Sequence, residues 1–200
     1  MSEPKSPQSP ATEPEIVVRD RRIACQNSKW QVFFDTIESR GKLAVSDYLV
    51  VSPHVTGRYS VSGVCVLPVL ADGCVVLLRN YRHPLEASFW ECVRGFIDAG
   101  EEPGTAARRE LEEETGLACR PDRLIPLGYT AQEPSTFAAR VALYAALDCR
   151  LSRTPDADEL GLGAAHPVPL DDALRMANDG TIEDATTLIA LYRYSGLARG

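Results

Sequence analysis

A dense run of glutamates near the middle of the chain has residue types and spacing that could support chemistry. The stretch GFIDAGEEPGTAARRELEEETGL, residues 95–117, contains Glu110, Glu113 and Glu114. Read as a helix from about Pro103 to Thr115, it gathers these carboxylates inside an arc of roughly 100°. Like charges on one helix face destabilise the helix, so a cation is expected to offset them. Hard cations such as Mg²⁺ or Mn²⁺ bind such oxygen clusters, and bound Mg²⁺ commonly contacts substrate phosphates as well.

The same stretch resembles a complete Nudix box, the signature of the Nudix hydrolase superfamily. The specified positions are all filled: Gly95, Glu101, Arg109, Glu110, Leu111, Glu113, Glu114, Gly116 and Leu117. A solvated acidic helix between two turn glycines is the plain structural alternative. A motif with this many fixed positions is far more specific than a lone glycine pattern. The resemblance implies a hydrolase that cleaves phosphoanhydride bonds with the help of Mg²⁺ or Mn²⁺.

The resemblance also implies roles for individual residues. Glu110 and Glu114, one helical turn apart, are expected to bind the metal, with Glu113 as a third ligand or as a catalytic carboxylate. The backbone carbonyl of Arg94, just before the box, is expected to be a further metal ligand. The Arg94 side chain is larger than the small residue often found there, which leaves the shape of the neighbouring pocket open. Arg109 is expected to serve catalysis by orienting the glutamates through an ion pair.

Two segments upstream of the box are similar to the ADP-ribose pyrophosphatase branch of the superfamily. They are LLRNYRHP, residues 77–84, and WECVRG, residues 90–95. In that branch, the arginine and glutamate that match Arg82 and Glu91 line the substrate pocket. Taken without the family, Arg82 is a guanidinium beside a strand end, which suits a bidentate phosphate contact. A surface salt bridge is the alternative interpretation of Arg82.

Two segments downstream of the box bear on substrate and catalysis. Enzymes of this branch often carry a Ser-Pro-Gly element between the next two strands, and Pro134, in Glu-Pro-Ser, is its shifted counterpart here. The acidic residue frequent before the following strand is absent. Similar enzymes place a catalytic glutamate on the loop at residues 151–165. Glu159 is the nearest match, and Asp156 and Asp158 are the alternatives.

The predicted substrate is therefore a small-molecule nucleotide. A nucleoside diphosphate sugar, ADP-ribose first, would be split into a nucleoside monophosphate and a sugar phosphate. GDP-mannose, NADH, dinucleoside polyphosphates and nucleoside triphosphates remain alternatives, because the segments after the box depart from the pattern of the branch. A nucleotide-sensing module that has kept the fold without catalysis is a second class of function. The intact box favours hydrolysis, since a sensor has no need of it.

The elements that must position these residues follow from the hydrophobic pattern. Residues 15–60 alternate between apolar and polar side chains and predict at least three antiparallel strands. The continuous apolar runs on either side of Asp72-Gly73 predict a hairpin of strands buried on both faces. Two further strands are expected in residues 118–150, and helices near the carboxyl terminus. The predicted fold class is α/β: a Nudix fold, an α/β/α sandwich around a mixed sheet, with a small amino-terminal antiparallel β region.

This pattern divides the chain into three parts. Residues 1–14, rich in proline, are expected to be a disordered tail. Residues 15–60 are the amino-terminal β region, and residues 61–200 form the Nudix domain with its box at 95–117. In similar enzymes, such a β region packs across a homodimer and lends an aromatic side chain to the neighbour's nucleotide pocket. Trp30 is the candidate for that role, and plain packing is the alternative.

Composition narrows the class of partner and the compartment. The net charge is −7 and there is no basic patch, so no nucleic-acid partner is expected. The 6 cysteines form no CxxC pair, which is typical of reduced, buried thiols. The first residues, MSEPKSPQSPATEPE, have no apolar core, so no signal peptide is expected. No apolar run is long enough to span a bilayer, so no membrane partner is expected and the predicted location is the cytoplasm.

Overall fold

The structure is a computed structural model that describes residues 16–39, 42–156 and 160–198. The tail predicted over residues 1–14 lies outside the described residues. In chain order, the strands and helices are β1 (Ile16–Gln26), β2 (Trp30–Ser39), β3 (Lys42–Pro53), β4 (Val61–Leu70), β5 (Cys74–Arg82), β6 (Ala87–Glu91), β7 (Val93–Phe96), α1 (Pro103–Thr115), β8 (Leu117–Ala118), β9 (Leu124–Thr130), β10 (Arg140–Leu151), β11 (Ala165–Pro169), α2 (Leu170–Asn178) and α3 (Ala185–Ala198).

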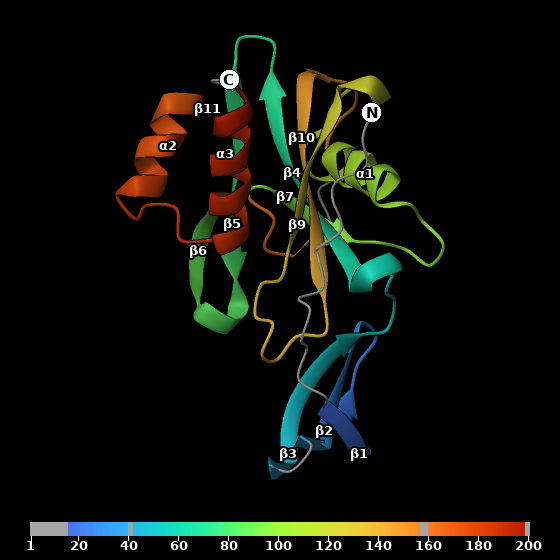
Figure 1. Ribbon diagram of the computed structural model, residues 1–200. Coiled ribbons are helices and arrows are strands. Elements are labelled where there is room, and N and C mark those ends of the chain that lie inside the picture. Colours follow the sequence, from blue (N-terminus) through green and yellow to red (C-terminus); the bar gives the residue numbers. More distant parts are fainter. Residues whose placement is uncertain (1–15, 40–41, 157–159, 199–200) are drawn as a thin grey trace.

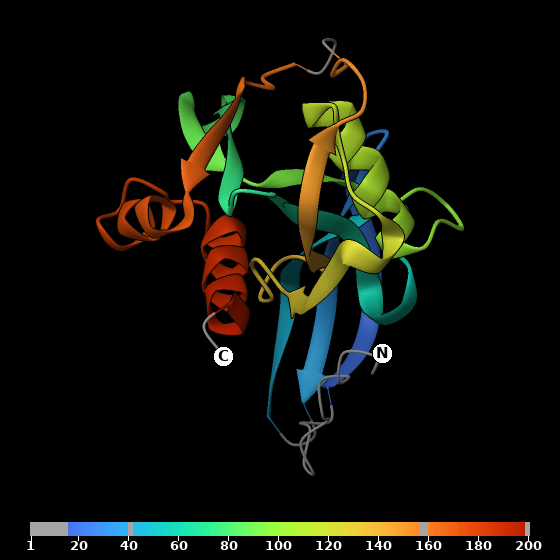
Figure 2. The same cartoon turned by 90° about the horizontal axis from the view of Figure 1, so that it is seen from above.

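A mixed sheet forms the centre of the molecule. Its strands follow the order β11-β5-β4-β10-β8, with β6 paired to β5, β7 to β4 and β9 to β10. Strands β4 and β10 run parallel, and the other described pairs in this sheet are antiparallel. Helix α1 covers one side of these strands, and α2 and α3 lie on the other side (Figures 1 and 2). The predicted α/β/α sandwich around a mixed sheet is confirmed.

Strand β4 shows why its sequence reads as one continuous apolar run. Cys65, Leu67 and Val69 belong to the core on the α3 side. Val64 and Val66, which alternate with them, belong to the core on the α1 side. Successive side chains of a strand point to opposite faces, so a strand covered on both faces needs an apolar residue at every position. The two cores place β4 in the middle of the sandwich and give the site a rigid base.

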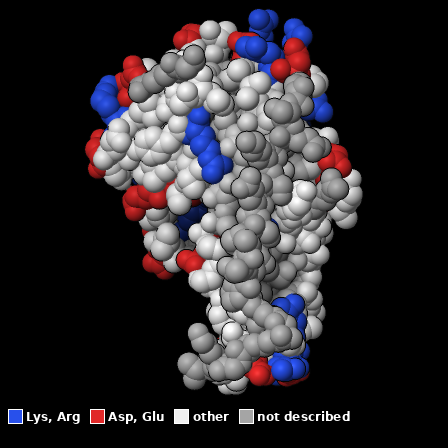
Figure 3. Space-filling view, viewed as in Figure 1, with Lys and Arg blue, Asp and Glu red and all other residues white. Residues whose placement is uncertain are grey.

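The amino-terminal residues form a separate antiparallel sheet in the order β1-β2-β3. In the space-filling view this sheet is a narrow projection below the main body, and the Lys and Arg residues on the drawn face are scattered (Figure 3). Arg21 of β1 donates two hydrogen bonds to Asp35 of β2, at 2.8 and 2.6 Å, which ties the two strands together. The predicted antiparallel β region is confirmed.

The projection is fastened to the main body through β3. The amide of Val51 donates to the carbonyl of Thr136 at 2.8 Å, and the amide of Ala138 donates back to Val51 at 2.9 Å. The ring of Trp30 lies 5.7 Å from those of Phe96 and Phe137. The loop between β9 and β10 therefore extends the small sheet. It also places Phe137 beside Trp30, whose ring contacts Phe96, the residue that follows Gly95. Within the described residues, no helix is long and apolar enough to cross a membrane.

Candidate active site

Helix α1 presents the box glutamates because its two ends are well defined. Pro103 opens the helix, where its missing N–H costs nothing. Gly116 ends it in the left-handed conformation, with φ of 69°, and a β-carbon there would lie 2.2 Å from the carbonyl oxygen of Arg153. Both bounds agree with the sequence prediction. The apolar residues of α1, including Leu111, face the core, which turns the carboxylates toward β7.

Two of these carboxylates are buried against the main chain of β7. Glu110 and Glu114 are only 8% and 6% exposed. A β-carbon at Gly95 would lie 1.8 Å from the carboxyl carbon of Glu110, so only glycine fits there. The amide of Arg94 donates to Oε2 of Glu114 at 3.3 Å. The structure thus brings together Glu110, Glu114 and the Arg94 main chain, three of the predicted metal-binding groups.

The carbonyl of Arg94 points in the same direction as its amide. Arg94 lies opposite Cys65 in the antiparallel pairing of β7 with β4. Its amide donates to Glu114 and not to a carbonyl of β4, so Arg94 and Cys65 form a pair without main-chain hydrogen bonds between them. In an extended strand, the N–H and C=O of one residue lie on the same edge. The carbonyl is therefore directed toward the carboxylates of α1, as a metal ligand from this position would require.

Arg109 lies among the remaining carboxylates and pairs with several of them. It donates to Glu101 at 2.9 Å, to Glu110 at 2.7 Å and to Glu113 at 3.0 Å. Another bond, of 2.9 Å, joins it to the carbonyl of Phe96. The hydrogen bond from Arg109 is the main cause that holds the pKa of Glu101 below its ordinary value. These are the ion pairs expected of a residue that orients the glutamates, and we call Glu101, Arg109, Glu110, Glu113 and Glu114 the box cluster.

The donor set of the box cluster fits a hard divalent cation. Glu110 and Glu114 supply oxygen ligands from one face of one helix, and oxygen is the donor that Mg²⁺ and Mn²⁺ prefer. Gly95 leaves no side chain between β7 and Glu110. In the part of the chain that the structure describes, no three acidic, histidine or cysteine side chains already surround one metal position. Arg109, which pairs with Glu110 and Glu113, accounts for their present orientation.

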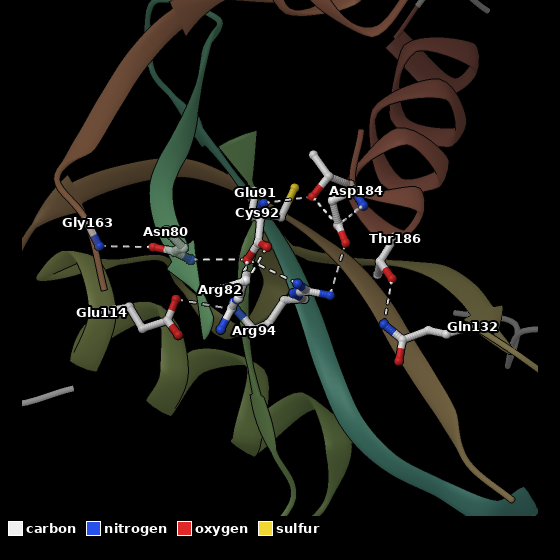
Figure 4. A network of polar contacts seen from close by, with 11 residues as sticks. Asn80, Arg82, Glu91, Cys92, Arg94, Glu114, Gln132, Gly163, Asp184 and Thr186 are labelled. Atoms are coloured by element: carbon white, nitrogen blue, oxygen red, sulfur yellow. Dashed lines mark hydrogen bonds and ion pairs between the residues drawn. The ribbon is translucent and has the colours of Figure 1, made fainter. Parts of the chain in front are cut away.

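A second group of charges lies where β5, β6, β7 and α3 meet. Arg82 pairs with Glu91, and Arg94 pairs with Glu91 at 3.0 Å and with Asp184 at 3.2 Å (Figure 4). Asn80 joins the group by donating to Glu91 at 3.2 Å. Burial opposes ionisation of Glu91, but the hydrogen bond from Arg82 and the charges of Arg94 and Arg82 outweigh it and lower its pKa. We call Arg82, Glu91, Arg94 and Asp184 the crossover cluster.

The crossover cluster bears on the predicted substrate-binding residues. The salt bridge considered for Arg82 is present, yet the Arg82 side chain remains 38% exposed while that of Glu91 is 2% exposed. Part of the Arg82 side chain therefore faces solvent, while its Nε and Nη2 atoms bond Glu91. Glu91 is covered, so it can affect a substrate contact by holding Arg82.

Trp30 and Pro134 lie at the junction with the small sheet. Trp30, half-buried at the start of β2, contacts Phe96 and Phe137 of its own chain. Pro134 is exposed in the loop that β3 holds, where the hydroxyl of Tyr48 donates to the carbonyl of Ser135 at 2.8 Å. Phe96 follows Gly95 directly, so this aromatic junction adjoins the box. The contribution of Trp30 to a partner's pocket stays a prediction.

The loop that follows β10 returns to α1. The amide of Asp156 donates to the carbonyl of Glu113 at 2.8 Å, and the Asp156 carboxylate pairs with Arg153 at 2.9 Å. Asp158 and Glu159, the other candidates for a catalytic acid, lie outside the described residues. Beyond them, the amide of Gly163 donates to Oδ1 of Asn80 at 3.0 Å. Of the described residues on either side, Asp156 is therefore held at α1 and Gly163 at the buried Asn80.

A cavity of about 790 Å³ borders the first turn of α1. Its walls include Glu101, Glu102, Tyr129 and Tyr144, and none of its described lining residues is basic. Burial, then Tyr129 and Glu102, raise the pKa of Tyr144 to about 12, so this phenol stays protonated. The walls of this cavity are therefore acidic and phenolic, without a basic side chain among its described lining residues.

Sequence reasoning missed the internal partners of the site. Asn80 bonds Glu91 and Gly163, and its place as a polar residue after an apolar run is the signal of buried hydrogen bonding that could have identified it. Asp184 caps the start of α3, since it accepts the amide of Thr187 at 2.8 Å. Its second role, as an ion-pair partner of Arg94, had no signal in the local sequence.

The fold and the glutamate-lined site together define the class of this protein. A mixed sheet between helices, with the box helix laid against β7, is the Nudix architecture. The family model described as NUDIX domain matches residues 60–189. The chain therefore belongs to the Nudix family, whose hydrolases act on pyrophosphate bonds.

Similar proteins of known name support the same class. The ADP-ribose pyrophosphatase of Bacillus subtilis (strain 168) is 33% identical over 64% of this chain and 69% of its own length. A methanol dehydrogenase activator of Bacillus methanolicus is 32% identical over 75% of this chain and 82% of its own. A crystal structure described as an ADP compounds hydrolase has a TM-score of 0.77 and covers 96% of this chain and 98% of that chain. At 21% identity, that last likeness shows the fold alone.

Proposed function

We propose that this protein is a divalent-cation-dependent hydrolase of nucleoside diphosphate sugars, with ADP-ribose as the first candidate substrate. The observation that carries the proposal is the pair of buried carboxylates, Glu110 and Glu114, held against the main chain at Arg94 and Gly95. Both carboxylates come from one face of α1 and present oxygen donors toward the main chain of β7. Mg²⁺ or Mn²⁺ is the cation whose ligand preference fits them.

The reaction is attack of water on one phosphorus of the pyrophosphate. A bound cation would neutralise negative charge on the phosphates and lower the pKa of a water molecule. Glu110 and Glu114 hold the cation, Arg109 orients Glu110 and Glu113, and a carboxylate removes the proton from the attacking water. Glu113 or Glu159 takes that role in the proposal. The products are a nucleoside monophosphate and a sugar phosphate.

The substrate class rests on residues outside the box. Arg82 keeps an accessible guanidinium at the end of β5, where it suits a phosphate oxygen. The Bacillus subtilis relative, which this chain matches over 69% of its length, is named ADP-ribose pyrophosphatase. A shorter match from Mus musculus, 46% identical over 61 residues, is named ADP-sugar pyrophosphatase. The Pro134 loop and the aromatic junction at Trp30 would border the nucleoside end.

A panel of substrates tests this proposal. ADP-ribose, GDP-mannose, NADH, diadenosine polyphosphates and nucleoside triphosphates are each incubated with Mg²⁺ or Mn²⁺, and products are resolved by chromatography. We expect a nucleoside diphosphate sugar to exceed every triphosphate in kcat/KM by at least ~10-fold, which is about 1.4 kcal/mol of differential transition-state binding. If dATP or GTP is the best substrate, the substrate class is wrong although the Nudix chemistry stands. If nothing in the panel turns over, the nucleotide-sensing alternative replaces hydrolysis.

We further propose that the active form is a homodimer joined through the small sheet. The sheet projects from the main body (Figures 1 and 3) and exposes large apolar side chains of β1 and β3, among them Ile16, Val18, Ile23, Tyr48 and Leu49. A small sheet of this kind needs another surface to bury its apolar side chains. Analytical ultracentrifugation at micromolar concentration is expected to give a dimer. A fully active monomer of 21.8 kDa would contradict the proposal.

A further inference from the structure

The chain crosses from one half of the sheet to the other immediately beside the candidate cation site. Strand β6 pairs with β5, whereas β7 pairs with β4, and the strands are interrupted at Cys92. The amide of Cys92 finds its partner outside the sheet, because it donates to Oγ1 of Thr187 in α3 at 2.9 Å. Helix α3, and not a neighbouring strand, therefore holds the chain at this crossing.

Arg94 adds a second connection between the crossing and α3. Its guanidinium pairs with Glu91, at the end of β6, and with Asp184, in front of α3. Asp184 is itself fixed, since its Oδ2 accepts the amide of Thr187 at 2.8 Å and the hydroxyl of Thr187 at 2.7 Å. Figure 4 shows Arg94 between Glu91 and Asp184, with Glu114 on the opposite side of its backbone. One residue thus meets the crossover cluster with its side chain and the box cluster with its main chain.

We propose that Arg94 is a positioning residue for the cation site, whose guanidinium, anchored on Glu91 and Asp184, holds the Arg94 main chain against Glu114. The inference rests on the proposed function, because it concerns the same site. It assigns a role to a side chain that the box motif does not specify. Metal sites depend on such outer partners, whose loss commonly weakens metal affinity by ~10- to 100-fold.

The geometry favours the guanidinium for this task. Arginine presents several N–H donors in a rigid plane, so it can bridge two carboxylates on different elements at once. The Arg94 side chain is 20% exposed, and the carboxylates it meets are 2% and 14% exposed, so water competes little for these bonds. Arg82 shares Glu91, but its main chain lies at the end of β5, whereas the amide of Arg94 donates to Glu114 of α1. Arg94 is therefore the member of the cluster that can transmit position to the box.

Direct binding of Mn²⁺ without substrate tests the inference. Free Mn²⁺ is measured by electron paramagnetic resonance during titration of the wild type, Arg94→Gln, Arg94→Lys and Glu114→Gln. Arg21→Gln is the matched control, because Arg21 also pairs with a buried carboxylate, Asp35, but in the small sheet. We expect Arg94→Gln to raise the Kd for Mn²⁺ by at least ~10-fold and Arg94→Lys to raise it less. Arg21→Gln is expected to bind Mn²⁺ like the wild type, even where Arg21→Gln and Arg94→Gln both lower Tm.

Each outcome separates the inference from the proposed function. If Glu114→Gln leaves Mn²⁺ binding unchanged, the cation site itself is wrong and both proposals fall. If Glu114→Gln weakens binding but folded Arg94→Gln does not, only the role of Arg94 is overturned. Should Arg94→Gln fail to fold, Arg94→Lys and Asp184→Asn decide, because each keeps a polar group in place and removes one part of the anchor. Wild-type affinity in both of these variants would then refute the role.

Discussion

The box cluster and the crossover cluster meet at strand β7, and they differ in the balance of their charges. The box cluster, as defined from the described residues, contains four carboxylates and the guanidinium of Arg109, which pairs with Glu101, Glu110 and Glu113. The crossover cluster sets two carboxylates, Glu91 and Asp184, against two guanidiniums. The first is partly open, with the Glu113 side chain 36% exposed, whereas the Glu91 side chain is 2% exposed. Among the described residues, carboxylates outnumber guanidiniums in the box cluster, whereas the two kinds of charge are equal in number in the crossover cluster.

The difference indicates what each cluster is for. Carboxylates in excess repel one another, and a bound cation relieves that repulsion, so a metal bound as proposed would stabilise the box cluster. A balanced cluster has no such need, and its value lies in fixed geometry and in the cost of breaking it. The contrast predicts that changes in the box cluster act mainly on turnover, while changes in the crossover cluster act on stability and, where they loosen Arg94, on metal affinity.

Glu114→Gln tests most directly whether the box cluster supports turnover, and it has the largest expected effect. The amide keeps the size of the side chain but removes one negative charge from the ligand set. We expect kcat to fall by at least ~10²-fold with the fold intact, since stabilising charge in such a site is worth several kcal/mol. Steady-state kinetics at saturating Mg²⁺, together with circular dichroism, measure the two quantities.

The matched control for this variant is Glu112→Gln in the same helix. Glu112 lies next to Glu113 but outside the box cluster, and the change removes the same charge from the same helix. We expect its kcat to stay close to that of the wild type. Near-normal turnover of Glu114→Gln, or an equal loss in both variants, would show that the buried carboxylates do not hold the cation.

Glu91→Gln probes the crossover cluster, where the expected effect is on stability. The change leaves the guanidiniums of Arg82 and Arg94 without their shared buried carboxylate, which costs about 3 kcal/mol in comparable pairs. We expect a loss of that size in urea unfolding near neutral pH. Because the pKa of Glu91 is lowered in the folded protein, its contribution is present above its ordinary value of 4.5 and is lost as pH falls through the folded value.

The difference between wild type and Glu91→Gln is the quantity to follow with pH, because the other acidic groups titrate in both proteins. We expect it to be constant from about pH 7 to about pH 5 and to narrow below that. A difference that does not change with pH would mean that packing, and not the charge of Glu91, supplies the stability. A large loss of kcat with unchanged stability would place Glu91 in the chemistry and contradict the contrast.

Local patterns in the sequence were sufficient for most of the fold. The two-sided apolar run of β4, the Asp72-Gly73 turn and the ends of α1 each follow from residues close together in the chain, and all are observed. In that turn, Asp72 accepts the amide of Cys74 at 3.0 Å and Gly73 has φ of 85°. Such signals act over a few residues, so they survive without knowledge of tertiary contacts.

The site divides in the same way. The box glutamates share one helix, so their common face was predictable from spacing. The bond between Arg94 and Asp184 joins residues far apart in the sequence, and nothing local to either residue indicates it. The contacts of Trp30 with Phe96 and Phe137 are hidden for the same reason, because three separate segments have to meet. Partners of this kind are set by topology, which the sequence reveals only through the finished fold.

An exposed ion pair gives the baseline for both clusters and the smallest expected effect. Arg120 and Asp122 pair at 2.8 Å, which is shorter than the 3.0 Å between Arg94 and Glu91, but their side chains are 79% and 57% exposed. Water and salt screen such a pair, and its formation orders two mobile side chains. We therefore expect Asp122→Asn to change the free energy of unfolding by less than about 0.5 kcal/mol. Urea unfolding of Asp122→Asn and Glu91→Gln side by side measures the loss of unfolding free energy in each variant. Equal losses would show that burial does not set the difference between these ion pairs.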